Sequence, residues 1–378
     1  MQITHLKLEN WRNFLHVDVP LKKRMFLVGP NASGKSNLLD VFRFLRDIAD
    51  DQGGFQSAVQ TRKGVSKLRS LHARRYSNIV IDVAMEIDGK SWTYRLEFTQ
   101  DNNRRAIVKK ETVAANGRCL LDRPNEQDNQ DPELLTQTHL EQIQANKDFR
   151  EVVDFFKKIR YLHIIPQLIR DTDRSSGKQW SPYGGDFLEQ LVRTQEKTLK
   201  SRLRRIVAAL KVAVPNLKEL ELNRDDRGTP HLRGLFSHWR PDAGWQLEDQ
   251  FSDGTLRLLG LLWGFLDGAA PLLLEEPELS LHYAVVRHIP GILARLSRRT
   301  GRQILLSSHS AELLSDPGID ANEVLLLKPT REDTRVTVAA NEIEIGRLLE
   351  GGMSIADAVL PWTAPPIVQQ LTLFGDAP

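Results

Sequence analysis

The segment Gly29-Pro30-Asn31-Ala32-Ser33-Gly34-Lys35-Ser36 has the pattern of a loop that wraps around phosphate groups. A strand-like apolar run (25–28) precedes it, and a run with helical apolar spacing (38–48) follows it. Glycines allow the backbone to approach phosphates closely, and the helix N-terminus that follows favours an anion. In this context Lys35 is expected to reach the β- and γ-phosphates of ATP, and the Ser36 hydroxyl is expected to bind Mg²⁺. An incidental glycine-rich turn is the alternative.

Composition describes a globular chain rather than a membrane or disulfide-bonded one. The chain has 378 residues, of which 40% are hydrophobic and 27% charged, and its net charge is +3. No apolar run approaches the roughly 20 residues of a membrane span, and the N-terminus lacks a signal pattern. Because Cys119 is the only cysteine, a disulfide within the chain and a multi-cysteine zinc site are excluded, and a cytoplasmic location is expected.

The pattern along the chain predicts an α/β fold with insertions. Two strand-like runs (79–87 and 92–98) flank an Asp88-Gly89 turn and predict an antiparallel hairpin. Helices are expected over 134–159, 186–212 and 256–266, and a strand over 161–165. After Phe251 the pattern alternates helix and buried strand, as in a parallel sheet. We expect a core lobe with a β insertion (1–130), a helical insertion (131–215), a second core lobe (216–345) and a C-terminal tail (346–378).

Two buried-strand runs in the second lobe end in residues that suit nucleotide chemistry. The run 272–274 leads into Glu275-Glu276-Pro277-Glu278, and the run 303–306 leads into Ser307-Ser308-His309-Ser310. Carboxylates at the carboxyl ends of parallel strands stand where nucleotide sites form. We expect Glu275 to hold the metal, Glu276 to polarise the attacking water, and His309 to donate to the γ-phosphate or the water. A charged strand cap and a structural histidine are the alternatives.

A third motif, Phe251-Ser252-Asp253-Gly254-Thr255, precedes the predicted helix 256–266. Ser252 and Gly254 at a helix N-terminus can bind a phosphate through backbone N–H groups. Because the first loop already holds the triphosphate, we expect binding in trans, across an ATP-bridged dimer. An ordinary helix cap is the alternative.

Together these motifs resemble those of ABC-type ATPases of the SMC/RecF branch, and within it the OLD-like ATPases. The opening segment, Ile3 to Phe14, resembles the branch's first strand and Asn-Phe turn, and Gly29 to Ser36 resembles its Walker A motif. Ser252-Asp253-Gly254-Thr255 resembles the signature motif, Leu274 to Glu278 with Leu281-His282 resembles Walker B and the D-loop, and His309 resembles the switch histidine. The resemblance implies a P-loop NTPase head of ABC/SMC type with an inserted antiparallel β region and a helical subdomain, in which two chains enclose two ATP molecules.

The resemblance also assigns site residues. Lys35, Glu276 and His309 are expected to be catalytic, and Ser36, Glu275 and Gln167, a candidate glutamine-loop residue, are expected to hold Mg²⁺. The expected nucleotide contacts are Arg12, Asn31, Ala32, Ser33, Gly34, Lys35, Ser36, Asn37, Ser252 and Gly254.

Partners are predicted from two further features. The basic side chains Arg193, Lys197, Lys200 and Arg204 fall on one face of the predicted helix 186–212, which indicates DNA or a solvated charged face. Gln370-Leu371-Thr372-Leu373-Phe374 resembles the short peptides that enter bacterial sliding clamps, or is a strand packed on this chain's own core.

These features leave three functional hypotheses. OLD proteins carry a C-terminal Toprim nuclease, but only about 50 residues follow Leu327, too few for such a domain, so any nuclease is expected to be a separately encoded partner. The leading hypothesis is an ATP-hydrolysing switch in DNA-associated or antiphage processes. A RecF-type repair or replication ATPase, and an ATP-binding scaffold with little turnover, are the alternatives.

Overall fold

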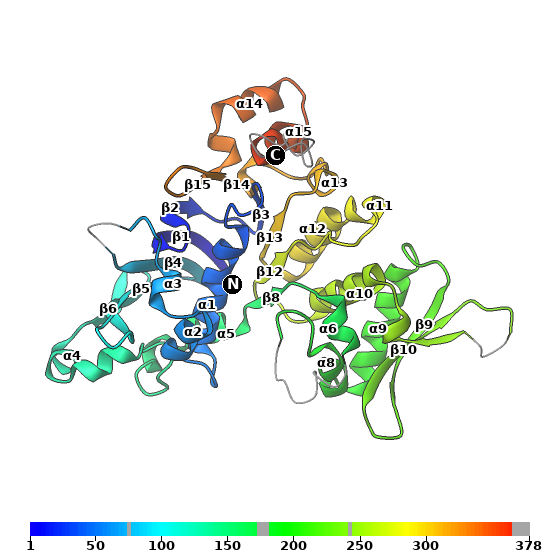
Figure 1. Ribbon diagram of the computed structural model, residues 1–378, viewed down its shortest axis with the longest axis horizontal. Coiled ribbons are helices and arrows are strands. Elements are labelled where there is room, and N and C mark those ends of the chain that lie inside the picture. Colours follow the sequence, from blue (N-terminus) through cyan, green and yellow to red (C-terminus); the bar gives the residue numbers. More distant parts are fainter. Residues whose placement is uncertain (74–76, 172–180, 241–243, 365–378) are drawn as a thin grey trace, which may run out of the picture. The chain divides into compact units, whose positions relative to one another are not determined.

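The computed structural model describes residues 1–73, 77–171, 181–240 and 244–364 (Figure 1). The chain folds into two compact units. The first unit consists of Met1–Arg160, Ala270–Leu273 and Pro290–Pro378, and the second consists of Tyr161–Ala269 and Leu274–Ile289. Among the described residues, no helix combines the length and apolar character that crossing a bilayer requires.

The β insertion of the first unit is a six-stranded antiparallel sheet with the order β2-β1-β4-β5-β6-β7. Its strands are β1 (Gln2–Trp11), β2 (Phe14–Pro20), β4 (Ile79–Ile87), β5 (Lys90–Gln100), β6 (Ala106–Ala115) and β7 (Arg118–Arg123). Asp88 and Gly89 both have positive φ (48° and 80°), as a tight hairpin turn between β4 and β5 requires. The predicted hairpin and antiparallel insertion are therefore confirmed.

A buried ion cluster fixes the far edge of this sheet. Arg123 on β7 contacts Glu111 on β6 at 3.1 Å and Asp128 at 2.6 Å, and all three side chains are almost completely buried. Tyr94 donates to Glu111 at 3.2 Å. Because a buried charge is costly unless it is paired and hydrogen-bonded, this cluster holds β5, β6, β7 and the following helix α4 (Glu126–Gln130) together.

The second sheet contains the predicted parallel strands, in the order β15-β14-β3-β13-β12-β8. Its strands are β3 (Arg24–Val28), β8 (Arg160–Leu162), β12 (Leu272–Glu275), β13 (Ile304–Ser308), β14 (Val324–Pro329) and β15 (Thr334–Val338). β3 is parallel to both β13 and β14. Helix α1 (Lys35–Ala49) follows β3 and buries Leu38, Phe42, Leu45 and Ile48, the apolar face that its spacing predicts.

The second unit contains helices and a small sheet. Its helices are α6 (Pro166–Arg170), α8 (Phe187–Arg193), α9 (Glu196–Leu210), α10 (Asp253–Leu266) and α11 (Tyr283–Val286). The three-stranded antiparallel sheet has the order β11-β10-β9, with β9 (Leu217–Arg224), β10 (Pro230–Phe236) and β11 (Trp245–Leu247).

The remaining elements are further α-helices and 3₁₀ turns. They are α2 (Phe55–Thr61), α3 (Val65–Leu68), α4 (Glu126–Gln130), α5 (Arg150–Lys158), α12 (Ile289–Thr300), α13 (Ala311–Leu314), α14 (Ile343–Glu350), α15 (Ile355–Val359) and the 3₁₀ turns η1 (Pro132–Thr136), η2 (Lys147–Phe149), η3 (Glu248–Gln250), η4 (Ala321–Glu323), η5 (Ala339–Asn341) and η6 (Leu360–Thr363). Part of the segment expected as a tail therefore forms helices.

Two predicted helices are wrong in extent. The only α-helix within 134–159 is α5, because Glu141 accepts hydrogen bonds from Thr138 N and the distant Phe55 N and so holds the preceding segment in turns. The helix expected over 186–212 is two helices: Thr194 is extended (ψ 131°), and its hydroxyl donates to the Gln190 carbonyl at 2.7 Å. The predicted strand 161–165 is also shorter, because Pro166 begins α6.

Candidate nucleotide site

The glycine-rich loop joins β3 to α1 in the first unit and has the backbone that its sequence predicts. Gly34 has φ 95° and Ala32 has φ 63°. A Cβ at Gly34 would lie 2.2 Å from Asn13 Nδ2, and a Cβ at Gly29 would lie 2.6 Å from the Leu327 carbonyl oxygen. Both glycines are therefore required by close approach, and Gly34 also by its conformation.

Polar groups line the inside of this loop. The Lys35 ammonium donates to the carbonyls of Gly29 (2.8 Å) and Pro30 (3.1 Å), and the residue is only 6% exposed. The Ser33 hydroxyl is buried and has no hydrogen-bond partner among the described residues. A buried cation and an unsatisfied hydroxyl beside a helix N-terminus suit a phosphate group.

Asn13, in the turn between β1 and β2, supports the loop from outside. Its Nδ2 donates to the Ser33 carbonyl and to the Thr334 hydroxyl, both at 2.9 Å. Its Oδ1 accepts from Asn37 Nδ2 at 2.7 Å. The Asn-Phe turn was predicted as a family feature, but this bracing role for Asn13 was not, because sequence gives no measure of how close two distant turns come.

Arg12 is held in place by a neighbouring carboxylate. Its Nη2 lies 2.7 Å from Asp40 Oδ2, and Arg62 binds the same carboxylate at 2.8 Å. Burial favours the neutral acid, but the hydrogen bond and charge of Arg62, with the charge of Arg12, keep the pKa of Asp40 below its ordinary value. Asp40 therefore remains ionised at neutral pH and fixes the Arg12 side chain, whose backbone has φ 51°.

A groove of about 730 Å³ opens beside the loop. It is lined by Arg12, Asn13, Asn37, Ser66, Lys67, Arg69, Leu71, His72 and residues 329–334. The predicted contacts Arg12 and Asn37 therefore share one depression with further cationic side chains, which suits a ligand with negative charge.

His309 lies at the same edge of the sheet as the loop. In the parallel pairing of β13 with β3, Ser308 is opposite Val28. His309 follows Ser308 directly, as Gly29 follows Val28, so the two chain segments leave the sheet side by side.

Glu275 is the last residue of β12 and Glu276 follows it, and both belong to the second unit. Glu276 has φ 43°, a left-handed conformation that is rare for a non-glycine residue and is found preferentially at functional sites. His163 Nδ1 lies 3.3 Å from the Glu275 carbonyl oxygen, and burial lowers the pKa of His163. His163 was not predicted; its position in a buried strand-like run was the only available signal.

The signature-like segment caps α10 and contacts the chain that follows Glu276. The Ser252 hydroxyl accepts from Thr255 N at 3.2 Å. A Cβ at Gly254 would lie 2.7 Å from the Ser280 carbonyl oxygen, so a glycine is required there as well.

Two side chains of α6 bind Asp253. Arg170 Nη1 contacts it at 2.7 Å, and Gln167 Nε2 donates to it at 3.3 Å. Arg170 Nη2 also donates to the Phe251 carbonyl at 2.6 Å. The sequence predicted Gln167 as a metal ligand; the structure shows its amide nitrogen on the signature segment, and the role of Arg170 was not predicted.

Each unit thus holds one part of the predicted site. The first unit brings together Arg12, residues 31–37 and His309, and the second contains Gln167, Ser252, Gly254, Glu275 and Glu276. That the two parts form one pocket stays a prediction.

The fold and the phosphate loop define an α/β protein with a P-loop, the nucleotide-binding motif of P-loop NTPases. Residues 24–315 match the family described as "AAA domain, putative AbiEii toxin, Type IV TA system". Since this match covers most of the chain, the protein belongs to that family, whose members are generally ATPases that use a nucleotide and Mg²⁺.

Solved SMC heads have a similar fold. An SMC head bound to the C-terminal winged-helix domain of ScpA is 15% identical, with a TM-score of 0.51, over 89% of this chain and 97% of that one. A Pyrococcus furiosus SMC head with an extended coiled coil, bound to the C-terminal domain of ScpA, is 12% identical, with a TM-score of 0.51, over 93% and 100%. Among curated proteins, no sequence matches this chain.

Proposed function

We propose that this protein is an ATP-hydrolysing switch that dimerises around ATP. The observation that carries the proposal is the phosphate loop, with the Lys35 ammonium turned into it and His309 leaving the sheet beside it. Ser252 and Gly254 of a second copy would contact the same nucleotide, and hydrolysis would release the dimer.

The metal-binding residues we propose are Ser36, Glu275 and Gln167. The described residues hold no group of three or more His, Cys, Asp or Glu side chains that could bind a metal alone. This fits Mg²⁺, which prefers oxygen ligands and is usually bound by one or two protein groups together with phosphates and water. When bound, Mg²⁺ would neutralise charge on the β- and γ-phosphates.

The catalytic roles follow from the chemistry of the side chains. Glu276 would accept a proton from the water that attacks the γ-phosphorus, while the bond to the β-phosphate oxygen of ADP breaks. Lys35 would balance charge on the phosphates, and His309 would donate to a γ-phosphate oxygen. The left-handed backbone at Glu276 supports a functional role because such a conformation is strained.

The setting we propose is DNA-associated or antiphage activity in the cytoplasm, with a separately encoded effector such as a nuclease. For DNA, the predicted basic stripe gives limited support: Arg193 is on α8, whereas Lys197, Lys200 and Arg204 are on α9, and Lys200 is paired with Glu196 at 2.6 Å. The predicted clamp peptide at 370–374 lies outside the described residues.

Glu276→Gln tests the proposal. A switch enzyme should lose about 10²- to 10³-fold in turnover, keep its ATP affinity and accumulate as an ATP-bound dimer in size-exclusion chromatography with light scattering. The alternative scaffold would change little in either measurement. Glu344→Gln, at an exposed carboxylate of α14 outside the proposed site, serves as the charge-matched comparison. Unchanged turnover in Glu276→Gln would contradict the proposed mechanism.

A further inference from the structure

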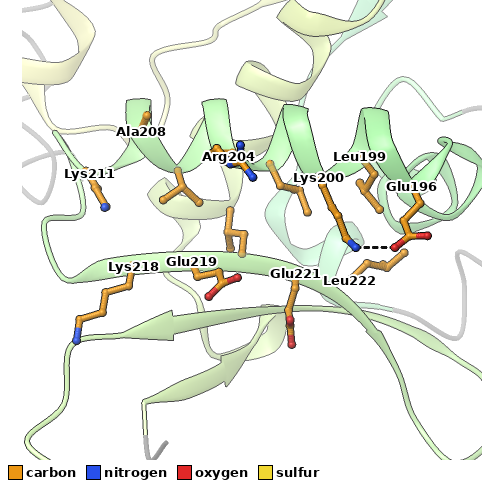
Figure 2. A pocket seen from close by; sticks show the side chains of 13 residues that line it. Glu196, Leu199, Lys200, Arg204, Ala208, Lys211, Lys218, Glu219, Glu221 and Leu222 are labelled. Atoms are coloured by element: carbon orange, nitrogen blue, oxygen red, sulfur yellow. Dashed lines mark hydrogen bonds and ion pairs between the residues drawn. The ribbon is translucent and has the colours of Figure 1, made fainter. Parts of the chain in front are cut away.

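A second groove, of about 860 Å³, lies in the second unit between α9 and β9, apart from every residue of the proposed nucleotide site. Figure 2 shows Lys200 and Arg204 on the helix above it, Lys211 just beyond the end of that helix, and Lys218, Glu219 and Leu222 on the strand below it. Its lining consists of Glu196, Leu199, Lys200, Leu203, Arg204, Val207, Ala208, Lys211 and residues 218–222.

The groove runs along the edge of β9 rather than over one face of the sheet. Five consecutive residues of β9 line it, although successive side chains of a strand point to opposite faces. β9 is a terminal strand in the order β11-β10-β9, and no described strand pairs with its outer edge. Alternate N–H and C=O groups along such an edge are available to another extended chain.

The helix side of the groove matches the strand side in length. The lining residues of α9 recur at helical spacing from Glu196 to Ala208, with Lys211 beyond the helix end. This stripe spans about 20 Å, roughly the length of a six-residue strand. Leu199, Leu203, Val207 and Leu220 form an aliphatic floor along it.

Positive charge is in excess on the rim. Lys200 is paired with Glu196, and Glu221 is paired with Arg233. Arg204, Lys211 and Lys218 have no ion pair among the described residues. Of the three carboxylates that line the groove, only Glu219 has no ion pair among those residues. In Figure 2, Lys211 and Lys218 lie at the same end of the groove.

We infer that this groove binds an extended acidic peptide segment of a partner protein, which adds a strand to the free edge of β9. Backbone bonds to β9 would supply affinity, aliphatic side chains would contact the floor, and acidic side chains would meet Arg204, Lys211 and Lys218. A nucleic acid suits the groove less well, because its lining has no aromatic ring on which a base could stack.

A peptide selection on the full chain tests this inference. Phage displaying random seven-residue peptides are selected on the immobilised protein, and enriched peptides are synthesised with fluorescein for anisotropy measurements. We expect enrichment of sequences that alternate aliphatic and acidic residues. The triple variant Arg204→Glu/Lys211→Glu/Lys218→Glu should bind them at least tenfold more weakly, and peptide binding should slow hydrogen exchange at residues 218–222.

A matched variant separates binding at the groove from attraction to the overall positive charge of the protein. Arg193→Glu/Lys197→Glu/Arg205→Glu makes the same charge change on α8 and α9 at residues outside the lining, and should bind the peptides normally. Two sets of peptides are N-methylated at alternate amides, one set at the odd and the other at the even positions. One of the two sets should bind at least tenfold more weakly, because its methyl groups block the amides that face β9. The inference is overturned if the selection enriches no sequence that alternates aliphatic and acidic residues. It is also overturned if the triple variant binds the peptides normally, or if both sets of N-methylated peptides bind normally. Competition by single-stranded DNA that depends on the same three cations would overturn it as well.

Discussion

The two parts of the candidate nucleotide site are held together by different kinds of contact. In the first unit, the phosphate loop is fixed by backbone conformation and by amide and ammonium bonds to carbonyls, at Gly34, Asn13 and Lys35. In the second unit, the contacts that hold the signature-like segment include an ion pair between side chains, that of Arg170 with Asp253.

This difference indicates different roles. Bonds between neutral backbone and amide groups keep the same partners at any ionic strength, as a preformed phosphate cradle needs. An ion pair between half-exposed side chains is weak, is screened by salt and can exchange partners. We therefore expect first-unit substitutions to change nucleotide affinity and second-unit substitutions to change the association of two chains.

The largest effect should come from Lys35→Ala. Loss of a charge-assisted contact to phosphate should weaken ATP binding by about 100-fold or more, on the order of 3 kcal/mol, in calorimetric titration. Lys23→Ala, just before the opposite end of β3, should bind ATP normally. If the two variants bind ATP with equal affinity, the nucleotide does not bind at this loop.

Gly34→Ala should have the next largest effect. The added methyl group would meet Asn13 and would also be placed at φ 95°, so ATP binding should fall by about 10- to 100-fold. Gly117→Ala, at φ 80° with no atom within 4 Å of the added Cβ, isolates the conformational cost of about 1 kcal/mol in stability. Adding Asn13→Gly to Gly34→Ala should recover part of the affinity; if it recovers none, the close approach is not the cause.

Arg170→Met tests the second unit. It removes contacts to Asp253 and to the Phe251 carbonyl, so ATP-dependent dimerisation should weaken by about tenfold while ATP affinity of the monomer stays unchanged. Analytical ultracentrifugation with and without ATP measures the first quantity, and titration below the dimerisation concentration measures the second. The exposed Arg205→Met is the control. If Arg170→Met instead weakens ATP binding by the monomer, the two units do not have the separate roles proposed above.

The smallest effect concerns His139, which follows the six-stranded sheet in the chain and lies outside both parts of the site. Burial, with the charge of Arg123, lowers the pKa of His139 from 6.5 to about 4. Between these values the unfolded chain binds a proton that the folded chain does not, so stability should fall as pH falls from 6.5 toward 4. Because the ring is only half-buried, we expect a loss on the order of 1 kcal/mol at pH 5. His139→Gln should lack this part of the pH dependence in denaturant unfolding, whereas ATP affinity should be the same in both proteins.

Sequence reasoning predicted the elements whose identity depends on local pattern. The loop around Gly34, the buried strands β3, β12 and β13, and the hairpin at Asp88-Gly89 all formed where expected. The missed features depend on distant contacts. Glu141 binds the Phe55 amide and prevents a long helix, Asn13 braces the loop, and Arg170 binds Asp253 across more than 80 residues of sequence. Periodicity cannot report such contacts because they join segments with no regular spacing.

The 2.7 Å approach between the Gly254 position and the Ser280 carbonyl has a consequence for how the family can diverge. A side chain at 254 would require the Ser280 carbonyl to move away, and a left-handed backbone (φ 59°) holds that carbonyl in place. A change at 254 therefore needs a change in the backbone around 280. In relatives with a larger residue at the first position, we expect the second to have lost that bend. These two sites should therefore be inherited as a pair even where the residues around them have been replaced.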